Sequence, residues 1–205
     1  AELATRHDLI VVADEIYGQL IYPPNEHLSI ATLPGMRERT VTLNGFSKSY
    51  AMTGWRVGYL AAPRDLVAML TEPRHTLSIN TSTISQHAAL AALTGPQEPF
   101  EAMFAAYAER RAWLMPALTE AGFTYGHPGG AFYIYTNVSP TGLAAPEFCE
   151  RLLRETGVML FPGTMFGDES TDYIRISYLQ PLPLIQEAMG RIATFVASNA
   201  ARAGS

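Results

Sequence analysis

Apolar residues along the chain alternate between short runs typical of strands and longer stretches with helical spacing. Residues 9–13 form a continuous apolar run, which predicts a strand buried on both faces. Residues 40–43 and 57–61 predict two further strands, and helical stretches follow at 63–77 and 83–93. This order of strands and helices is typical of an α/β unit.

The pattern changes in the second half of the chain. Residues 100–121 have helical spacing, and Pro116 predicts a kink there or a join between two helices. Further strands are expected at 131–135, 158–161 and 173–177, and further helices at 145–155 and 182–200. We therefore expect a mainly parallel α/β sheet with helices in residues 1–105 and a small α+β domain in residues 106–205.

Composition excludes several classes of function. The 205 residues carry a formal net charge of -5, so the chain has no basic footprint for nucleic acid. No apolar run approaches the roughly eighteen residues of a membrane span. A single cysteine, Cys149, excludes an internal disulfide and fits a reducing compartment, so we expect a cytoplasmic protein. The histidines lack metal-ligand spacing, and no metal is expected.

The most informative residue is Lys48, which lies between two predicted strands in a loop of glycine, serine and aromatic residues. We expect partial desolvation there, which favours the neutral, nucleophilic amine needed for a Schiff base. Asp14 and Lys48 both follow strands at the carboxyl edge, where open α/β sheets bind ligands. Tyr17 and Arg56 lie close by in sequence. An amine, an acid, a phenol and a guanidinium around one crevice suit pyridoxal 5′-phosphate.

Five motifs, in this order, resemble the C-terminal half of a fold-type I pyridoxal-phosphate enzyme of the class I/II aminotransferase family, with aspartate and aromatic aminotransferases. They are Asp14-Glu15-Ile16-Tyr17, Ser47-Lys48 through Gly54-Trp55-Arg56-Val57-Gly58-Tyr59, Gly129-Gly130-Ala131-Phe132-Tyr133, Pro162-Gly163 with Phe166-Gly167, and Arg175-Ile176-Ser177. The resemblance implies that residues 1–105 are the C-terminal part of the cofactor-binding large domain and that residues 106–205 are the small domain.

The resemblance also implies roles for individual residues around the cofactor. Lys48 would form the Schiff base with pyridoxal phosphate and then carry the proton that leaves the substrate Cα. Asp14 would pair with the pyridinium nitrogen, which makes the ring an electron sink. Tyr17 would hydrogen-bond the ring oxygen O3′.

Two arginines are implied to bind anionic groups by bidentate hydrogen bonding. Arg56 would bind the cofactor phosphate, and Arg175 would bind the substrate α-carboxylate. Ser47 could also reach the phosphate. Many relatives place a hydroxyl three residues before the lysine, where this chain has Gly45.

The implied function is transfer of an amino group from an L-amino acid to a 2-oxo acid, by a protein that is a homodimer when full length. A carbon–sulfur β-lyase of the same fold and a non-catalytic truncated fragment are the alternatives, and the amino donor stays open. The family's glycine-containing phosphate turn, ring-stacking aromatic residue and O3′-binding asparagine would all precede Asp14. We therefore expect a fragment with free sheet edges beside residues 9–13 and 40–43.

Overall fold

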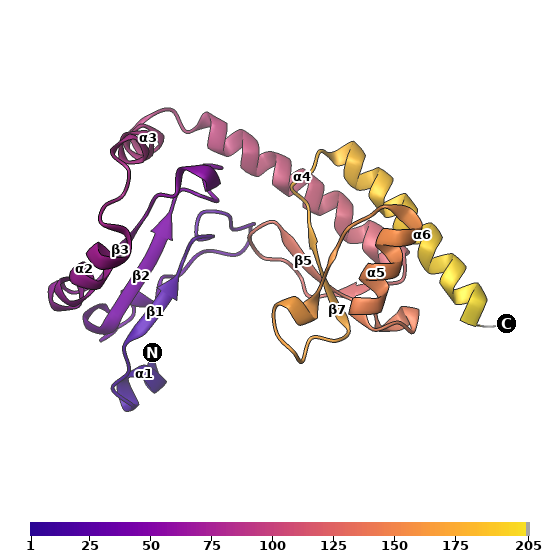
Figure 1. Cartoon of the computed structure of the whole chain (residues 1–205), viewed down its shortest axis with the longest axis horizontal. Coiled ribbons are helices and arrows are strands. Elements are labelled where there is room, and N and C mark those ends of the chain that lie inside the picture. Colours follow the sequence, from indigo (N-terminus) through magenta and orange to yellow (C-terminus); the bar gives the residue numbers. More distant parts are fainter. Residues whose placement is uncertain (204–205) are drawn as a thin grey trace. The chain divides into compact units, whose positions relative to one another are not determined.

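The protein divides into two compact units, one of Ala1–Ala102 and one that begins at Met103. The structure is a computed structural model that describes residues 1–203 (Figure 1). Both this division and the predicted domain boundary at residues 105/106 fall inside one helix, α4 (Glu98–Glu120). The two units are described in turn.

The first unit holds a three-stranded sheet in the order β1-β2-β3. Its strands are β1 (Val11–Asp14), β2 (Thr40–Gly45) and β3 (Gly58–Ala61), which confirms the three predicted strands. The burial of β1 on both faces was wrong, because β1 lies at one side of the sheet and its Val12 side chain is exposed. Around them lie the helices α1 (Glu2–Arg6), α2 (Arg64–Ser78) and α3 (Thr83–Thr94), and the short 3-10 helices η1 (Ile30–Thr32), η2 (Arg37–Arg39) and η3 (Thr53–Trp55).

Strand direction brings three strand ends to one edge of this sheet. β1 runs parallel to β2, but β3 runs antiparallel to β2, with Gly45 opposite Gly58. A parallel return needs a crossover of about a dozen or more residues, usually a helix, whereas residues 46–57 contain only η3. The ends of β1 and β2 and the start of β3 therefore lie at the same edge. The order of the strands also corrects one expectation. β2 is hydrogen-bonded to a strand on each side, so the unpaired strand expected at residues 40–43 was wrong. The two outer strands of the sheet are β1 and β3.

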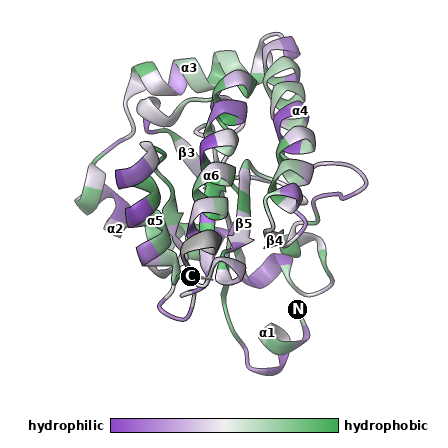
Figure 2. Cartoon of the chain, turned by 90° about the vertical axis from the view of Figure 1, so that its right-hand side faces the viewer, coloured by the Kyte–Doolittle hydropathy of each residue, from purple (hydrophilic) through white to green (hydrophobic). Residues whose placement is uncertain are grey.

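The apolar surface of the first unit is only partly covered. All four residues of β3 are exposed, and α2 buries none of its residues. Hydrophobic residues recur along α3 in Figure 2, and Ile84, Leu90 and Leu93 of that helix are exposed. Among the described residues, no helix has the length and hydropathy required to cross a bilayer.

The second unit is an antiparallel sheet with helices packed on one face. Its strands follow the order β4 (Thr124–Tyr125), β5 (Tyr133–Asn137), β7 (Tyr173–Ser177) and β6 (Phe161–Pro162). The remaining elements are α5 (Ala145–Thr156), α6 (Leu182–Ala203), η4 (Ser139–Thr141) and η5 (Gly163–Met165). Strand alternation buries Ile134, Ile174 and Ile176 on one face and turns Arg175 to the other.

Three elements of this half differ from the predicted ones. β5 begins at Tyr133 rather than at residue 131, because Ala131 has a φ of 57°, which no strand residue adopts. β6 covers only Phe161–Pro162 of the strand expected at 158–161. The predicted join between two helices at Pro116 was wrong, because α4 continues through this residue. Burial of Tyr107, Leu114 and Leu118 along α4 compensates for the hydrogen bond that proline lacks.

Candidate functional site

One pocket of the first unit lies at the edge where the three strand ends meet. Four predicted site residues line it: Asp14, Ser47, Lys48 and Arg56. The other lining residues are Ile16, Leu43, Asn44 and Thr53. The pocket volume is about 360 Å³, within the range of small-molecule sites. The structure thus brings an amine, a carboxylate, a guanidinium and a hydroxyl to one small-molecule-sized space.

A tight turn after β1 sets the direction of the acid and the phenol. The backbone N–H of Ile16 donates to Asp14 Oδ1 at 3.2 Å, and the N–H of Gly18 donates to the Glu15 carbonyl at 2.8 Å. The turn places the Tyr17 ring centroid 5.8 Å from Lys48 Nζ. Tyr17 therefore lies near the outer limit of a cation–π interaction with the pocket amine, although it is not among the residues that line the pocket.

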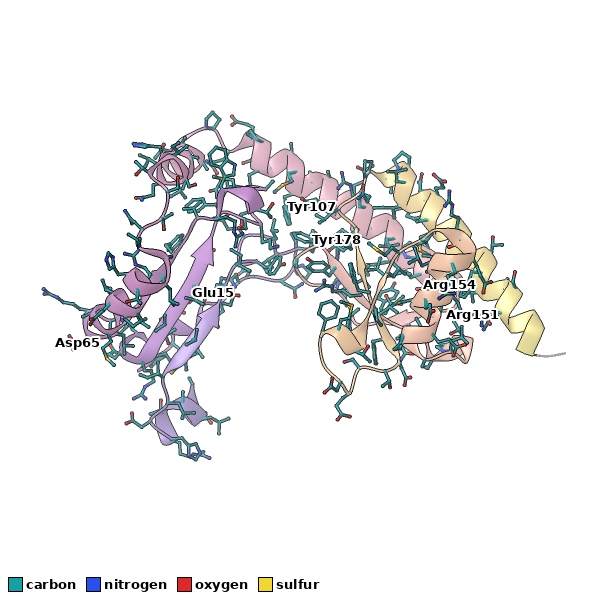
Figure 3. The ribbon with its side chains drawn as sticks, in the orientation of Figure 1. Glu15, Asp65, Tyr107, Arg151, Arg154 and Tyr178 are labelled. Atoms are coloured by element: carbon teal, nitrogen blue, oxygen red, sulfur yellow. The ribbon has the colours of Figure 1, made fainter. Side chains whose placement is uncertain are left out.

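Glu15 ties this turn to the loop that follows it (Figure 3). Its carboxylate accepts a hydrogen bond from Ser29 Oγ at 2.6 Å and lies 2.9 Å from His27 Nε2. The Glu15 backbone N–H donates to the Leu43 carbonyl at 2.9 Å, which extends the β1–β2 ladder. Only 11% of the Glu15 side chain is exposed. These contacts fix the residues on either side of it, Asp14 and Ile16.

The loop that carries Lys48 is held by apolar residues on its inner side. Phe46, Met52 and Val57 are buried together with Ala89 of α3. The Phe46 carbonyl accepts hydrogen bonds from the N–H groups of Tyr50 at 3.2 Å and Met52 at 3.3 Å. With the inner side packed in this way, Lys48 is left half-buried at the pocket wall.

Two residues of this loop have left-handed backbone conformations. Ala51 has a φ of 52° and Arg56 a φ of 51°, which cost energy for residues with a Cβ. The Arg56 guanidinium donates to the Thr53 carbonyl at 2.9 Å, so its chain folds back over η3 toward the pocket. Such local strain is common where a backbone has to aim functional side chains.

Gly45 and Gly58 let β2 and β3 approach closely below the pocket. A Cβ on Gly58 would lie 2.9 Å from the Asn44 carbonyl oxygen, and a Cβ on Gly45 would lie 3.1 Å from Gly58 Cα. This packing gives a physical reason for glycine at position 45. It also holds Asn44 at the pocket wall.

Arg175 lies in the second unit, on β7, and does not line this pocket. Its Cζ is 3.7 Å from the ring centroid of Phe166 and 4.4 Å from that of Tyr133. No ion pair of the described residues includes Arg175. The candidate residues are thus divided between the units, with five in the first and one in the second.

Sequence reasoning missed four pocket residues. Asn44 had a usable signal, because it follows the apolar run of β2 at the same strand end that singled out Asp14. Thr53 had none, since its position depends on how η3 folds back beside the lysine loop. The apolar residues Ile16 and Leu43 look like ordinary core positions in the sequence.

A larger hollow of about 850 Å³ lies elsewhere in the first unit. It is lined mainly by small residues and threonines of the sheet and its loops, together with Arg37, Glu38 and Arg64. Its walls contain no lysine, histidine or cysteine. The chemistry of nucleophilic or acid–base catalysis is therefore concentrated in the smaller pocket.

Comparisons with known proteins give a consistent pattern. The model of the family "Aminotransferase class I and II" matches residues 1–192. The aspartate aminotransferase of Pyrococcus abyssi is 41% identical over 94% of this chain, and the aromatic-amino-acid aminotransferase 2 of Thermococcus litoralis is 40% identical over 94%. The structure of an aromatic aminotransferase from Pyrococcus horikoshii superposes with a TM-score of 0.93 at 39% identity, covering 96% of this chain and 53% of that one. The chain spans 50% of each of the two curated relatives.

Proposed function

The chain belongs to the aminotransferase class I and II family, and from this premise we propose that the whole protein is a pyridoxal-5′-phosphate-dependent aminotransferase. It transfers the amino group of an L-amino acid to a 2-oxo acid. The observation that carries the proposal is the single pocket that holds Lys48, Asp14 and Arg56 together. Each of the three groups suits a different part of one small molecule.

The chemistry of the donor set fits pyridoxal phosphate. Lys48 offers an amine for the aldehyde, and Asp14 offers a carboxylate for the ring nitrogen. Arg56 offers a planar fork of N–H donors for the phosphate, with the Ser47 hydroxyl beside it. Tyr17, whose ring centroid lies 5.8 Å from the Lys48 amine, offers a phenol for the ring oxygen. When bound, the cofactor supplies an aldehyde that condenses with amines and a ring that withdraws negative charge from the substrate Cα.

The protein's own residues bind, orient and move a proton. Asp14 and Arg56 hold the two ends of the cofactor, and the packed loop of residues 46–57 fixes the direction of Lys48. Lys48 carries the Cα proton of the substrate, for which its half-buried amine is suitably placed at the pocket wall. Arg175 binds the substrate α-carboxylate with its paired N–H donors.

The proposed substrates are defined as a class, an α-amino acid and a 2-oxo acid. The relatives bear names for aspartate and for aromatic amino acids, so similarity does not select between them. The four groups of the pocket include one guanidinium and one amine, both with assigned partners. A carboxylate on the substrate side chain would need a further cation.

The activity is tested by fusing this chain behind the N-terminal half of the Pyrococcus abyssi relative. The fusion is given pyridoxal phosphate, a 15N-labelled amino acid and a 2-oxo acid. We expect the label to appear in the new amino acid with no net release of ammonia. The Lys48→Ala fusion should be inactive while it unfolds at the same temperature as the parent.

The same assay separates the reaction types. Release of ammonia and pyruvate from cystathionine, without label transfer, would identify a carbon–sulfur β-lyase instead. Equal transfer rates in the parent and the Lys48→Ala fusion would contradict the assignment of the lysine.

A further inference from the structure

The outward face of the second sheet is rich in aromatic residues. Strand pairing sets Tyr135 and Phe161 on either side of Arg175. Tyr173 stacks on Tyr135 with ring centroids 5.1 Å apart. Because side chains alternate along a strand, Tyr133 shares this face with Arg175, while Ile134, Ile174 and Ile176 lie on the buried face. The Arg175 guanidinium therefore lies among aromatic rings on this face.

Two of these rings contact the Arg175 guanidinium at short range. Cζ lies 3.7 Å from the Phe166 centroid and 4.4 Å from the Tyr133 centroid, compared with 5.9 Å for Phe161. The first two distances correspond to direct contact, whereas the third is at the outer limit of a cation–π interaction. A guanidinium stacked parallel to a ring uses its flat face and leaves its in-plane N–H donors for hydrogen bonds, and the 3.7 Å separation from Phe166 fits such stacking.

The backbone before Phe166 has no space for a side chain at Gly163. Gly163, at the start of η5, has the Tyr135 hydroxyl against the position of a missing Cβ. The same Cβ would lie 2.6 Å from the Ser170 carbonyl oxygen and 2.7 Å from that of Tyr173. Glycine is thus required for η5 to pack on the sheet and bring Phe166 to Arg175.

We propose that Phe166 and Tyr133 are positioning residues that hold the Arg175 guanidinium in a fixed orientation for a carboxylate. The rings satisfy the faces of the cation, and no acidic side chain of the described residues forms an ion pair with it. Its N–H edge is therefore ordered before a ligand arrives, which lowers the entropy cost of binding. This inference rests on the proposed function for the identity of the ligand, the α-carboxylate of an amino acid or 2-oxo acid.

The test uses the 205-residue chain without cofactor, so its outcome is independent of the chemistry of Lys48. The Arg175 Nε–Hε resonance of the 15N-labelled chain is assigned by its loss in Arg175→Lys. We expect an upfield ring-current shift of Hε and a further shift on titration with pyruvate. Phe166→Leu should reduce the ring-current shift and weaken pyruvate binding roughly fivefold.

Matched variants separate positioning from general stability. Phe166→Tyr and Tyr133→Phe keep a ring and should retain the shift and the affinity, while Tyr133→Leu should behave like Phe166→Leu. Phe161→Leu removes the more distant ring and should have a smaller effect than either. Unchanged amide resonances of the buried residues Leu152 and Ile192, which are not sequence neighbours of the substituted positions, verify the fold in each variant. If Arg175 does not respond to pyruvate, or if both leucine variants bind it as the parent does, the proposal is overturned.

Discussion

At the scale of single residues, the pocket combines groups whose directions are fixed by different neighbours. Asp14 Oδ1 accepts a hydrogen bond from Ile16 two residues later, and the Arg56 guanidinium donates to the Thr53 carbonyl. Lys48 depends instead on the buried residues of its own loop. Since each support is separate, substitution of one group should leave the others in place and affect one function at a time.

Arg56→Lys tests whether the guanidinium fork, rather than its charge, binds the phosphate. The variant keeps the positive charge but loses the paired donors, so we expect affinity for pyridoxal phosphate to fall about tenfold. Absorbance titration of the fusion protein measures the affinity. Arg64→Lys, an exposed position at the start of α2, is the matched control and should bind as the parent does. Equal affinities for the parent and Arg56→Lys would contradict the proposal that the Arg56 guanidinium binds the phosphate with paired donors.

Cys149 gives a prediction about pH. Burial raises the pKa of the Cys149 thiol from its ordinary 9.0 to about 11. The folded state therefore holds this proton more tightly than the unfolded state does. Its contribution to stability is complete below pH 9 and is lost as the pH rises toward 11. Urea unfolding from pH 8 to 11 should show a steeper decline for the parent than for Cys149→Ala. Parallel declines would show that the thiol is not protected by burial.

At the scale of elements, the site depends on the close approach of β2 and β3. Gly58→Ala would place a methyl group 2.9 Å from the Asn44 carbonyl oxygen, so the strands would have to separate. We expect the free energy of unfolding to fall by about 1–3 kcal/mol in urea titrations. Gly54→Ala, where nothing lies within 4 Å of the added Cβ, should change it by less than about 0.5 kcal/mol. Equal losses in the two variants would contradict this account of the strand contact.

The main elements were predictable because their patterns are local. The apolar run of β1 and the helical spacing of α4 and α5 are properties of consecutive residues, and each element formed where it was expected. The direction of β3 was not predictable in the same way, because it depends on the shape of the loop at residues 46–57. Ala131 shows a further limit: it has a left-handed φ of 57°, which the intrinsic preference of alanine does not predict.

The candidate site follows the same division. The strand-end rule singled out Asp14 and Lys48 because it needs only the order of strands and loops. Thr53 and Leu43 line the same pocket because of the way the chain folds back, and this cannot be predicted from the spacing of residues in the sequence. The aromatic contacts of Arg175 likewise join side chains of β5, of the residue after η5 and of β7, and no local pattern in the sequence predicts them.

At the scale of the whole molecule, the first unit exposes large apolar side chains on its sheet and helices. Val12 on β1 and Tyr59 on β3 are 65% and 54% exposed at the two sheet edges. Because the chain covers 50% of its curated relatives, we expect the other half of such a protein to cover this surface.

A charge at an exposed edge tests this expectation. Val12→Lys should reduce self-association of the isolated chain, measured by light scattering, because charged residues oppose edge-to-edge pairing of strands. Its free energy of unfolding should stay within about 0.5 kcal/mol of the parent. Val41→Lys, on the central strand where the side chain is 6% exposed, should instead unfold the first unit. Unchanged scattering from Val12→Lys would show that this edge is not a site of association.

The central claim is that Lys48 is the amine that holds pyridoxal phosphate. The most direct measurement is borohydride reduction of the protein in the presence of the cofactor, followed by peptide mapping by mass spectrometry. We predict a single phosphopyridoxyl group on Lys48, the only lysine in the chain, and none in Lys48→Ala. Tagging of the N-terminal amine alone, or equal tagging of the parent and Lys48→Ala, would contradict the account.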